Sequence, residues 1–225
     1  MSRMMIISAA VAVLGVGAYF VTTPGPQTSG TSIDLPGAAF AQGTEADIDT
    51  STIVDMSIGN PDAPVTVVEY ASFTCPHCAA FHAGPFKQLK TDYIDTGKIN
   101  FVYREVYFDR FGLWASMIAR CGGRAQSFFG MTDLIYAEQS TWSRAGEPAA
   151  IVAELRKIGA LAGLDGDAME TCLQDGDEAR TLVAWYQENA EADGIESTPS
   201  FVINGKRYSN MSYADMAELI DDASE

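Results

Sequence analysis

Residues 65–78 of the chain, VTVVEYASFTCPHC, decide the fold. The apolar run 65–71 predicts a buried strand, and the residues after the second cysteine follow a helical pattern. The CPHC motif of residues 75–78 therefore lies where a strand passes into a helix, with its first sulfur at the helix N-terminus. Unpaired backbone N–H groups and the helix dipole favour a thiolate there. The stretch predicts reactive sulfur and redox chemistry.

The segments on either side of this stretch indicate a βαβ unit. A turn-forming cluster, GNPDAP at residues 59–64, precedes the strand. A helix is expected over residues 79–96, with a kink at Gly84-Pro85. Residues 99–106 predict a second strand. A strand, a helix and a strand in this order require a right-handed crossover and a parallel pair of strands.

The pattern then changes to helices alone, from about residue 112 to residue 189. Glycines separate the periodic runs, which predict helices near residues 113–121, 125–138, 148–162, 167–174 and 178–193. We interpret this segment as an all-helical subdomain inserted into an α/β fold.

Strand character returns near the C-terminus. Residues 200–203 predict a strand, Asn204-Gly205 is a strong hairpin signal, and residues 206–208 would form the returning strand. Ser212 is expected to cap a last helix over residues 213–222.

The N-terminus indicates export. Residues 1–21 combine Arg3 with an almost wholly apolar run from Met4 to Val21. The segment is either a cleaved signal peptide or an uncleaved membrane anchor, since 18 apolar residues just reach the length of a membrane span. Residues 22–52, rich in Gly, Pro, Ser, Thr and Ala, are expected to be a flexible tether outside the fold. We therefore expect a periplasmic protein.

The composition limits the partners. Charged residues make up 20% of the 225 residues and the net charge is −16, which argues against nucleic acid and anionic lipid. The only membrane contact expected is through the N-terminal anchor, and a monomer is the default expectation.

Four cysteines are present, which suggests disulfides in an exported protein. Cys75 and Cys78 are too close together for a useful structural bond, so Cys121 and Cys172 are the candidate structural pair. The loop between them is about fifty residues long, for which chain entropy estimates roughly 4 kcal/mol of stabilisation. The alternative is two separate buried thiols.

The combination of these features resembles the DsbA-type disulfide oxidoreductases, which have the thioredoxin fold. The resemblance covers residues 53–223 and includes the turn cluster, the CPHC motif, Glu69 six residues before Cys75, and Thr198-Pro199. It implies an α/β thioredoxin fold with an inserted helical subdomain, and an enzyme that needs no cofactor.

The resemblance also implies residue roles. Cys75 would be the exposed nucleophile, and Cys78, one turn deeper, the buried leaving thiol. His77 would stabilise the Cys75 thiolate when protonated; the alternative is a solvated turn histidine. Pro199 would be a cis-proline against the sulfurs, with the Thr198 backbone free to pair with a bound peptide.

Two further side chains have competing interpretations. The resemblance implies that Glu69 lies beneath Cys78 and assists proton transfer; the alternatives are an edge position or a salt bridge with Arg104. His82 follows Cys78 by four residues, so Cys75, Cys78 and His82 are conceivable metal ligands. A fourth ligand is hard to find, and we expect no metal.

The function expected is that of an exported dithiol oxidase. It would pass the Cys75–Cys78 disulfide to reduced, unfolded secretory proteins and be reoxidised by a membrane quinone reductase of the DsbB kind. The alternatives are a disulfide reductase or isomerase on the same fold, including one for cytochrome maturation, and a thiol metallochaperone.

Overall fold

The computed structural model describes residues 48–225, and a five-stranded sheet lies at their centre. The strands are β1 Met56–Gly59, β2 Val65–Ala71, β3 Ile99–Glu105, β4 Ser200–Ile203 and β5 Lys206–Ser209. Their spatial order is β1-β3-β2-β4-β5; β2 and β3 are parallel, and the other neighbouring pairs are antiparallel. The predicted α/β fold, with its parallel central pair and its C-terminal hairpin, is confirmed.

Strand β1 was not predicted. Its four residues are too few to show a period, and they end at Gly59, which has a φ of +100°. A Cβ at this position would lie 2.4 Å from the carbonyl oxygen of Ile99. The glycine therefore allows β1 to approach the start of β3 closely while the chain turns toward β2.

The helix after the CPHC motif differs from the one expected. It begins at Pro76 and is broken into α1 Pro76–Ala83, α2 Pro85–Leu89 and a π-helical turn, Lys90–Ile94. The break falls at Gly84, whose φ of −133° and ψ of −81° are not helical. The predicted kink is thus a complete interruption.

All the structure between β3 and β4 is helical, as predicted. The helices are α3 Arg110–Arg120, α4 Ala125–Ala137, α5 Gln139–Trp142, α6 Pro148–Leu161, α7 Gly166–Gln174 and α8 Gly176–Ala192. The short α5 was not predicted. Helix α3 starts earlier than expected because the Asp109 carboxylate accepts hydrogen bonds from the backbone N–H groups of Phe111 and Gly112. The last helix, α9 Tyr213–Ala223, begins at the predicted cap, Ser212.

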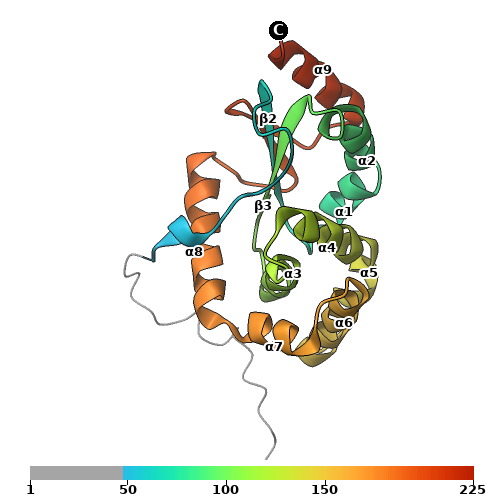
Figure 1. The fold of residues 1–225 in the computed structure, drawn as a ribbon, viewed down its shortest axis with the longest axis vertical. Helices are drawn as coiled ribbons and strands as arrows, with labels where there is room; N and C mark the ends of the chain where they lie inside the picture. The colour runs from blue at the N-terminus through green and yellow to red at the C-terminus, as the bar shows by residue number, and fades with distance from the viewer. Residues whose placement is uncertain (1–47) are drawn as a thin grey trace, which may run out of the picture. The chain divides into compact units, whose positions relative to one another are not determined.

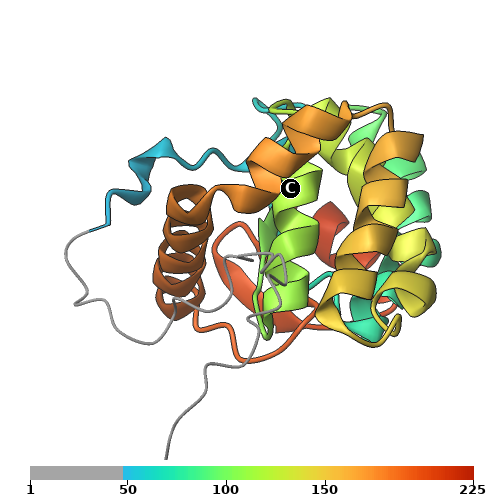
Figure 2. The same cartoon turned by 90° about the horizontal axis from the view of Figure 1, so that it is seen from below.

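The two faces of the sheet contact different helices. Helices α1 and α2 lie on one side of β2 and β3, and α8 lies on the other (Figure 1). Glu69 of β2 faces α1, where it contacts His82. The next residue, Tyr70, faces α8 and donates a hydrogen bond to the Asp193 carboxylate just beyond it. In the end-on view α3 lies between α8 and α6 (Figure 2).

The described part of the N-terminal segment is short. Of the expected tether, residues 22–52, only residues 48–52 are described, and Thr50–Thr52 form a 3-10 helix. The Thr50 hydroxyl donates a hydrogen bond of 2.7 Å to Glu188 on α8, so these last residues pack on the fold. The expected signal or anchor, residues 1–21, lies outside the described residues. Within residues 48–225, no helix has the length and apolar character needed to cross a bilayer.

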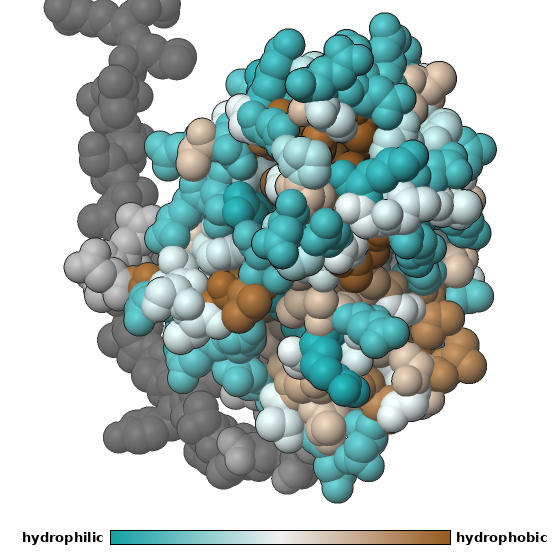
Figure 3. Space-filling view, turned by 45° about the horizontal axis from the view of Figure 1, so that its top comes forward, coloured by the Kyte–Doolittle hydropathy of each residue, from teal (hydrophilic) through white to brown (hydrophobic). Residues whose placement is uncertain are grey.

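The surface is largely hydrophilic, in line with the high net charge of the chain. Hydrophilic residues predominate on the face shown in Figure 3, and the apolar residues on it form small separate patches. This is the surface expected of a chain with a net charge of −16.

Candidate active site

The CPHC motif lies at the start of α1, as predicted. Cys75 is the N-cap residue, in an extended conformation, and Pro76 occupies the first helical turn. Pro suits this position because its missing N–H would have no partner there. Cys78 lies one turn further, and its side chain is fully buried. The two cysteines are not joined by a disulfide, so the structure shows the reduced site.

The two thiols differ strongly in acidity. The pKa of Cys75 is lowered from 9.0 to about 5, chiefly because the Cys78 thiol donates a hydrogen bond to its sulfur. The Thr198 side chain and the backbone N–H groups of Cys78 and His77 lower it further. The pKa of Cys78 is raised, first by burial, then by the hydrogen bond with Cys75 and by the charge of Glu69. At neutral pH the site therefore holds one thiolate, at Cys75, and one thiol.

Cys75 is less exposed than expected. Only 9% of its surface is accessible, although it was predicted to be exposed. The segment before β4 covers it: in the thiol form its sulfur donates to the carbonyl oxygen of Thr198 at 3.4 Å. The Thr198–Pro199 peptide bond is cis, as the resemblance implied. The Thr198 hydroxyl is buried beside the sulfur without a well-aligned partner among the described residues.

His77 is exposed on the surface of the first turn of α1. Its backbone N–H, rather than its ring, helps to lower the pKa of Cys75. The ring makes no hydrogen bond or ion pair within residues 48–225. The structure therefore brings the His77 main chain to the site and leaves its side chain in solvent.

Glu69 lies on the central strand β2 and is fully buried. Glu69 therefore does not lie at the edge of the sheet, and it does not form a salt bridge with Arg104, the two alternatives considered from the sequence. The carboxylate contacts His82 Nε2 at 2.9 Å, and both side chains are almost completely inaccessible. Arg104 instead pairs with Asp55 at 2.9 Å. Because residues 69 and 70 of the strand face opposite ways, a charge beside Tyr70 cannot reach Glu69.

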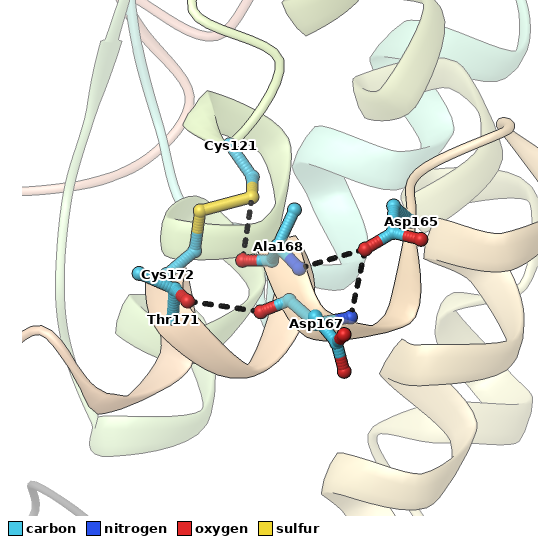
Figure 4. Close-up of a disulfide and its surroundings, with 6 residues drawn as sticks. All are labelled: Cys121, Asp165, Asp167, Ala168, Thr171 and Cys172. Atoms are coloured by element: carbon cyan, nitrogen blue, oxygen red, sulfur yellow. Dashed lines mark hydrogen bonds between the residues drawn. A yellow bond between two sulfur atoms is a disulfide. The ribbon is translucent and has the colours of Figure 1, made fainter.

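Cys121 and Cys172 form the expected structural disulfide, with their Cα atoms 5.8 Å apart. It joins the end of α3 to α7 (Figure 4). The Asp165 carboxylate caps the start of α7, since it accepts hydrogen bonds from the backbone N–H groups of Asp167 and Ala168. The disulfide is thus confined to the helical subdomain.

Many solved structures are similar to this chain. The sequence profile of the thioredoxin family matches residues 51–222. The crystal structure of α-DsbA1 from Wolbachia pipientis superposes with a TM-score of 0.69 and 28% identity, covering 76% of this chain and 90% of that one.

The chain is a DsbA-type member of the thioredoxin family.

Curated sequences give the same result for this DsbA-type protein. A Rickettsia bellii protein, provisionally named a protein-disulfide oxidoreductase, is 39% identical over 171 residues, which cover 76% of this chain and 65% of the relative. Disulfide bond formation protein D of Bacillus subtilis is 23% identical and covers 73% of this chain and 74% of its own. The chain spans only 60% to 65% of the length of the rickettsial relatives.

One residue of the DsbA-type site was missed by sequence analysis. The side-chain amide of Gln139, from α5, donates hydrogen bonds to the carbonyl oxygens of Phe73 at 2.7 Å and Cys75 at 2.9 Å. It is buried, so it fixes the backbone of the reactive loop from the helical subdomain. A glutamine in a short unpredicted helix gives no sequence signal for this contact.

A second contact holds the same loop. The Thr74 hydroxyl donates to the Asp109 carboxylate at 2.8 Å, and Asp109 also caps α3. Asp before a helical run is a recognisable cap signal, so this residue could have been found from the sequence. Its second role, next to the reactive cysteine, depends on the tertiary fold.

The metal interpretation has no geometric support among residues 48–225, which contain no group of three or more His, Cys, Asp or Glu side chains placed to hold an ion. His82 Nε2 is directed at Glu69.

Proposed function

We propose that this protein is an exported thiol-disulfide oxidoreductase that donates its Cys75–Cys78 disulfide to folding secreted proteins. The observation that carries the proposal is the contrast between the two thiols: Cys75, with a pKa of about 5, beside a buried Cys78 whose pKa is raised. A stable thiolate stabilises the reduced enzyme, and this makes the disulfide form a stronger oxidant. The provisional name of the rickettsial relatives supports the same activity.

The exchange requires no cofactor. A substrate thiolate would attack Cys75 Sγ, and the Cys75–Cys78 bond would break with its electron pair leaving on Cys78. A second substrate thiol would then release Cys75 as a thiolate, so the substrate gains a disulfide and the enzyme gains two electrons. The Thr198 carbonyl, 3.4 Å from the Cys75 sulfur, is positioned beside the point of attack.

We also propose the compartment in which the enzyme acts and the partner that reoxidises it. The apolar N-terminal segment, residues 1–21, supports export to the periplasm, either in soluble form or tethered to the membrane. The enzyme would act as a monomer and be reoxidised by a membrane quinone reductase of the DsbB kind, because each turnover leaves it reduced.

The reduction potential of the Cys75–Cys78 pair tests the direction of the reaction. We would equilibrate the full chain with glutathione buffers and measure the fraction oxidised. A value of about −120 to −150 mV, near the oxidising end of the known range, is expected for an oxidase. A value of about −250 mV or lower would contradict the proposal and indicate a reductase on the same fold.

A further inference from the structure

The turn that leads into the reactive cysteine is closed at Ser72. The Cys75 backbone N–H donates to the Ser72 carbonyl oxygen at 3.0 Å, so residues 72–75 form a hydrogen-bonded turn. The turn joins the end of β2, at Ala71, to the start of α1, at Pro76, and Ser72 is fully buried within it. The position of the Cys75 sulfur therefore depends on how firmly Ser72 is fixed.

A buried tyrosine of the helical subdomain binds the same carbonyl. The Tyr136 hydroxyl, on α4, donates to the Ser72 carbonyl oxygen at 3.2 Å. The hydroxyl oxygens of Tyr136 and of Tyr103, on β3, are 2.7 Å apart. A phenol has one proton, and that of Tyr136 goes to the carbonyl, so Tyr103 donates to Tyr136. These hydrogen bonds connect β3 and α4 to the turn before Cys75.

Both tyrosines are fixed in place and remain donors. Burial is the main cause that raises the pKa of Tyr103 and of Tyr136 well above the ordinary range, so both hydroxyls keep their protons. The Tyr136 ring also packs tightly, with its centroid 5.3 Å from that of Phe73 and 4.5 Å from that of His82. The hydroxyl of Tyr136 therefore has a well-defined position beneath the turn.

The other side of Ser72 faces the second sulfur. Burial is the largest cause of the raised pKa of Cys78, and the Ser72 backbone N–H acts in the opposite direction by hydrogen bonding to that sulfur. Ser72 thus contacts both cysteines, since its N–H acts on the Cys78 sulfur and its carbonyl binds the Cys75 backbone.

These contacts stabilise the reduced site more than the oxidised site. The reduced site holds a thiolate at Cys75 and a thiol at Cys78, and both sulfurs accept hydrogen bonds from nearby backbone N–H groups. In the disulfide neither sulfur carries a charge, so the same N–H groups have less to stabilise. Whatever holds the turn in place therefore favours the reduced form.

We infer that Tyr136 is a positioning residue of the redox site, which holds the Ser72 carbonyl and thereby makes the Cys75–Cys78 disulfide a stronger oxidant. The inference rests on the proposed function and deepens it. When the disulfide is reduced, its S–S bond breaks and two electrons pass from two substrate thiols to Cys75 and Cys78, while the substrate gains a disulfide. Tyr136 exchanges neither electrons nor protons in this step and acts through the backbone alone.

The redox equilibrium of Tyr136→Phe tests the inference, because this change removes the hydroxyl and keeps the ring. We would equilibrate the full chain with glutathione buffers and measure the oxidised fraction of the Cys75–Cys78 pair. We expect the equilibrium constant to shift about three- to tenfold toward the disulfide, the usual effect of one lost hydrogen bond. A tenfold shift corresponds to a reduction potential about 30 mV more negative.

A merely structural role would give a different result. Loss of packing or of a buried hydrogen bond that serves both forms alike would destabilise the oxidised and the reduced protein equally, and the potential would not change. Tyr107→Phe is the matched control, since it loses a hydroxyl contact of 2.9 Å with Ser116 on α3 that does not involve residues 72–75. We expect this variant to keep the wild-type potential.

Tyr103→Phe decides the matter if Tyr136→Phe does not fold. It removes the donor behind the Tyr136 hydroxyl and leaves Tyr136 in place, so a smaller shift in the same direction, about two- to threefold, is expected.

The outcomes separate the two proposals. A wild-type potential in the deciding variant, or an equal shift in Tyr107→Phe, would overturn the role of Tyr136 and leave the oxidoreductase function intact. A wild-type protein with a potential of about −250 mV or lower would overturn the oxidase function, while the difference between wild type and variant would still test Tyr136.

Discussion

At the scale of single residues, the two cysteines of the motif depend on each other for their charge. The Cys78 thiol is the largest cause of the lowered pKa of Cys75. Hydrogen bonds to charged groups contribute about 1.5–3 kcal/mol, which corresponds to about one to two pKa units. Cys78→Ala should therefore raise the pKa of Cys75 by about that amount. The rate of iodoacetamide alkylation against pH measures it.

Cys78→Ser is the matched variant for this measurement. It keeps a donor at the same place, so its alkylation profile should lie nearer to that of the wild type. Identical profiles for all three proteins would show that the Cys78 side chain does not stabilise the thiolate.

Gln139 permits a second prediction at this scale. In Gln139→Leu the Phe73 carbonyl oxygen loses its donor, whereas the Cys75 carbonyl oxygen still accepts the Ala79 backbone N–H at 3.2 Å. One unpaired buried acceptor costs about 1–3 kcal/mol. We therefore expect a free energy of unfolding lower by about 1–3 kcal/mol in urea titration. Gln174→Leu, at an exposed site on α7, should change it by less than about 0.5 kcal/mol. Equal effects of the two substitutions would contradict the anchoring role.

At the scale of secondary-structure elements, the disulfide between α3 and α7 should stabilise the helical subdomain. Its ends are 51 residues apart, for which the chain-entropy model gives roughly 4 kcal/mol. The double variant Cys121→Ala, Cys172→Ala should unfold at a correspondingly lower urea concentration. Its Cys75 alkylation profile should match that of the wild type, because the bond is confined to the subdomain. A changed profile would mean that the bond also shapes the reactive loop.

Sequence analysis predicted some of the strands and helices and missed others. Strands β2 and β3 and the hairpin of β4 and β5 were predicted because their signals are local: an apolar run, or a two-residue turn. Strand β1 and helix α5, each four residues long, carry no period and are defined by what they pack against.

Some contacts of the candidate site could likewise be predicted from local sequence, and others could not. Cys75, Cys78 and Pro199 follow from motifs, whereas the partner of Glu69 depends on which helix covers β2. The alternation of the strand does place Glu69 on the face opposite Tyr70, and the helical period places His82 below Cys78. Combining the two periods would have favoured this pair over Arg104.

At the scale of the whole molecule, the lowered pKa of Cys75 makes the stability of the reduced protein depend on pH. The folded protein holds this thiolate down to about pH 5, whereas the ordinary value is 9.0. The contribution is therefore complete above about pH 9 and is lost as the pH falls toward 5.

The reduced wild type, compared with reduced Cys75→Ser, should gain free energy of unfolding steadily between about pH 5 and pH 9 and level off above that range. Urea titrations of both proteins at several pH values measure the difference. A difference that does not vary with pH would show that the thiolate is not favoured by folding.

The amide of Gln139 has a consequence for engineering. Residues 110–192 form an insertion between β3 and β4, and it could be assumed that they can be removed to leave a minimal thioredoxin domain. Yet two hydrogen bonds to the loop in front of the reactive sulfur come from within that insertion. Excising the helices would remove both of these bonds and loosen the reactive loop, so the redox unit and its insertion are not independent modules.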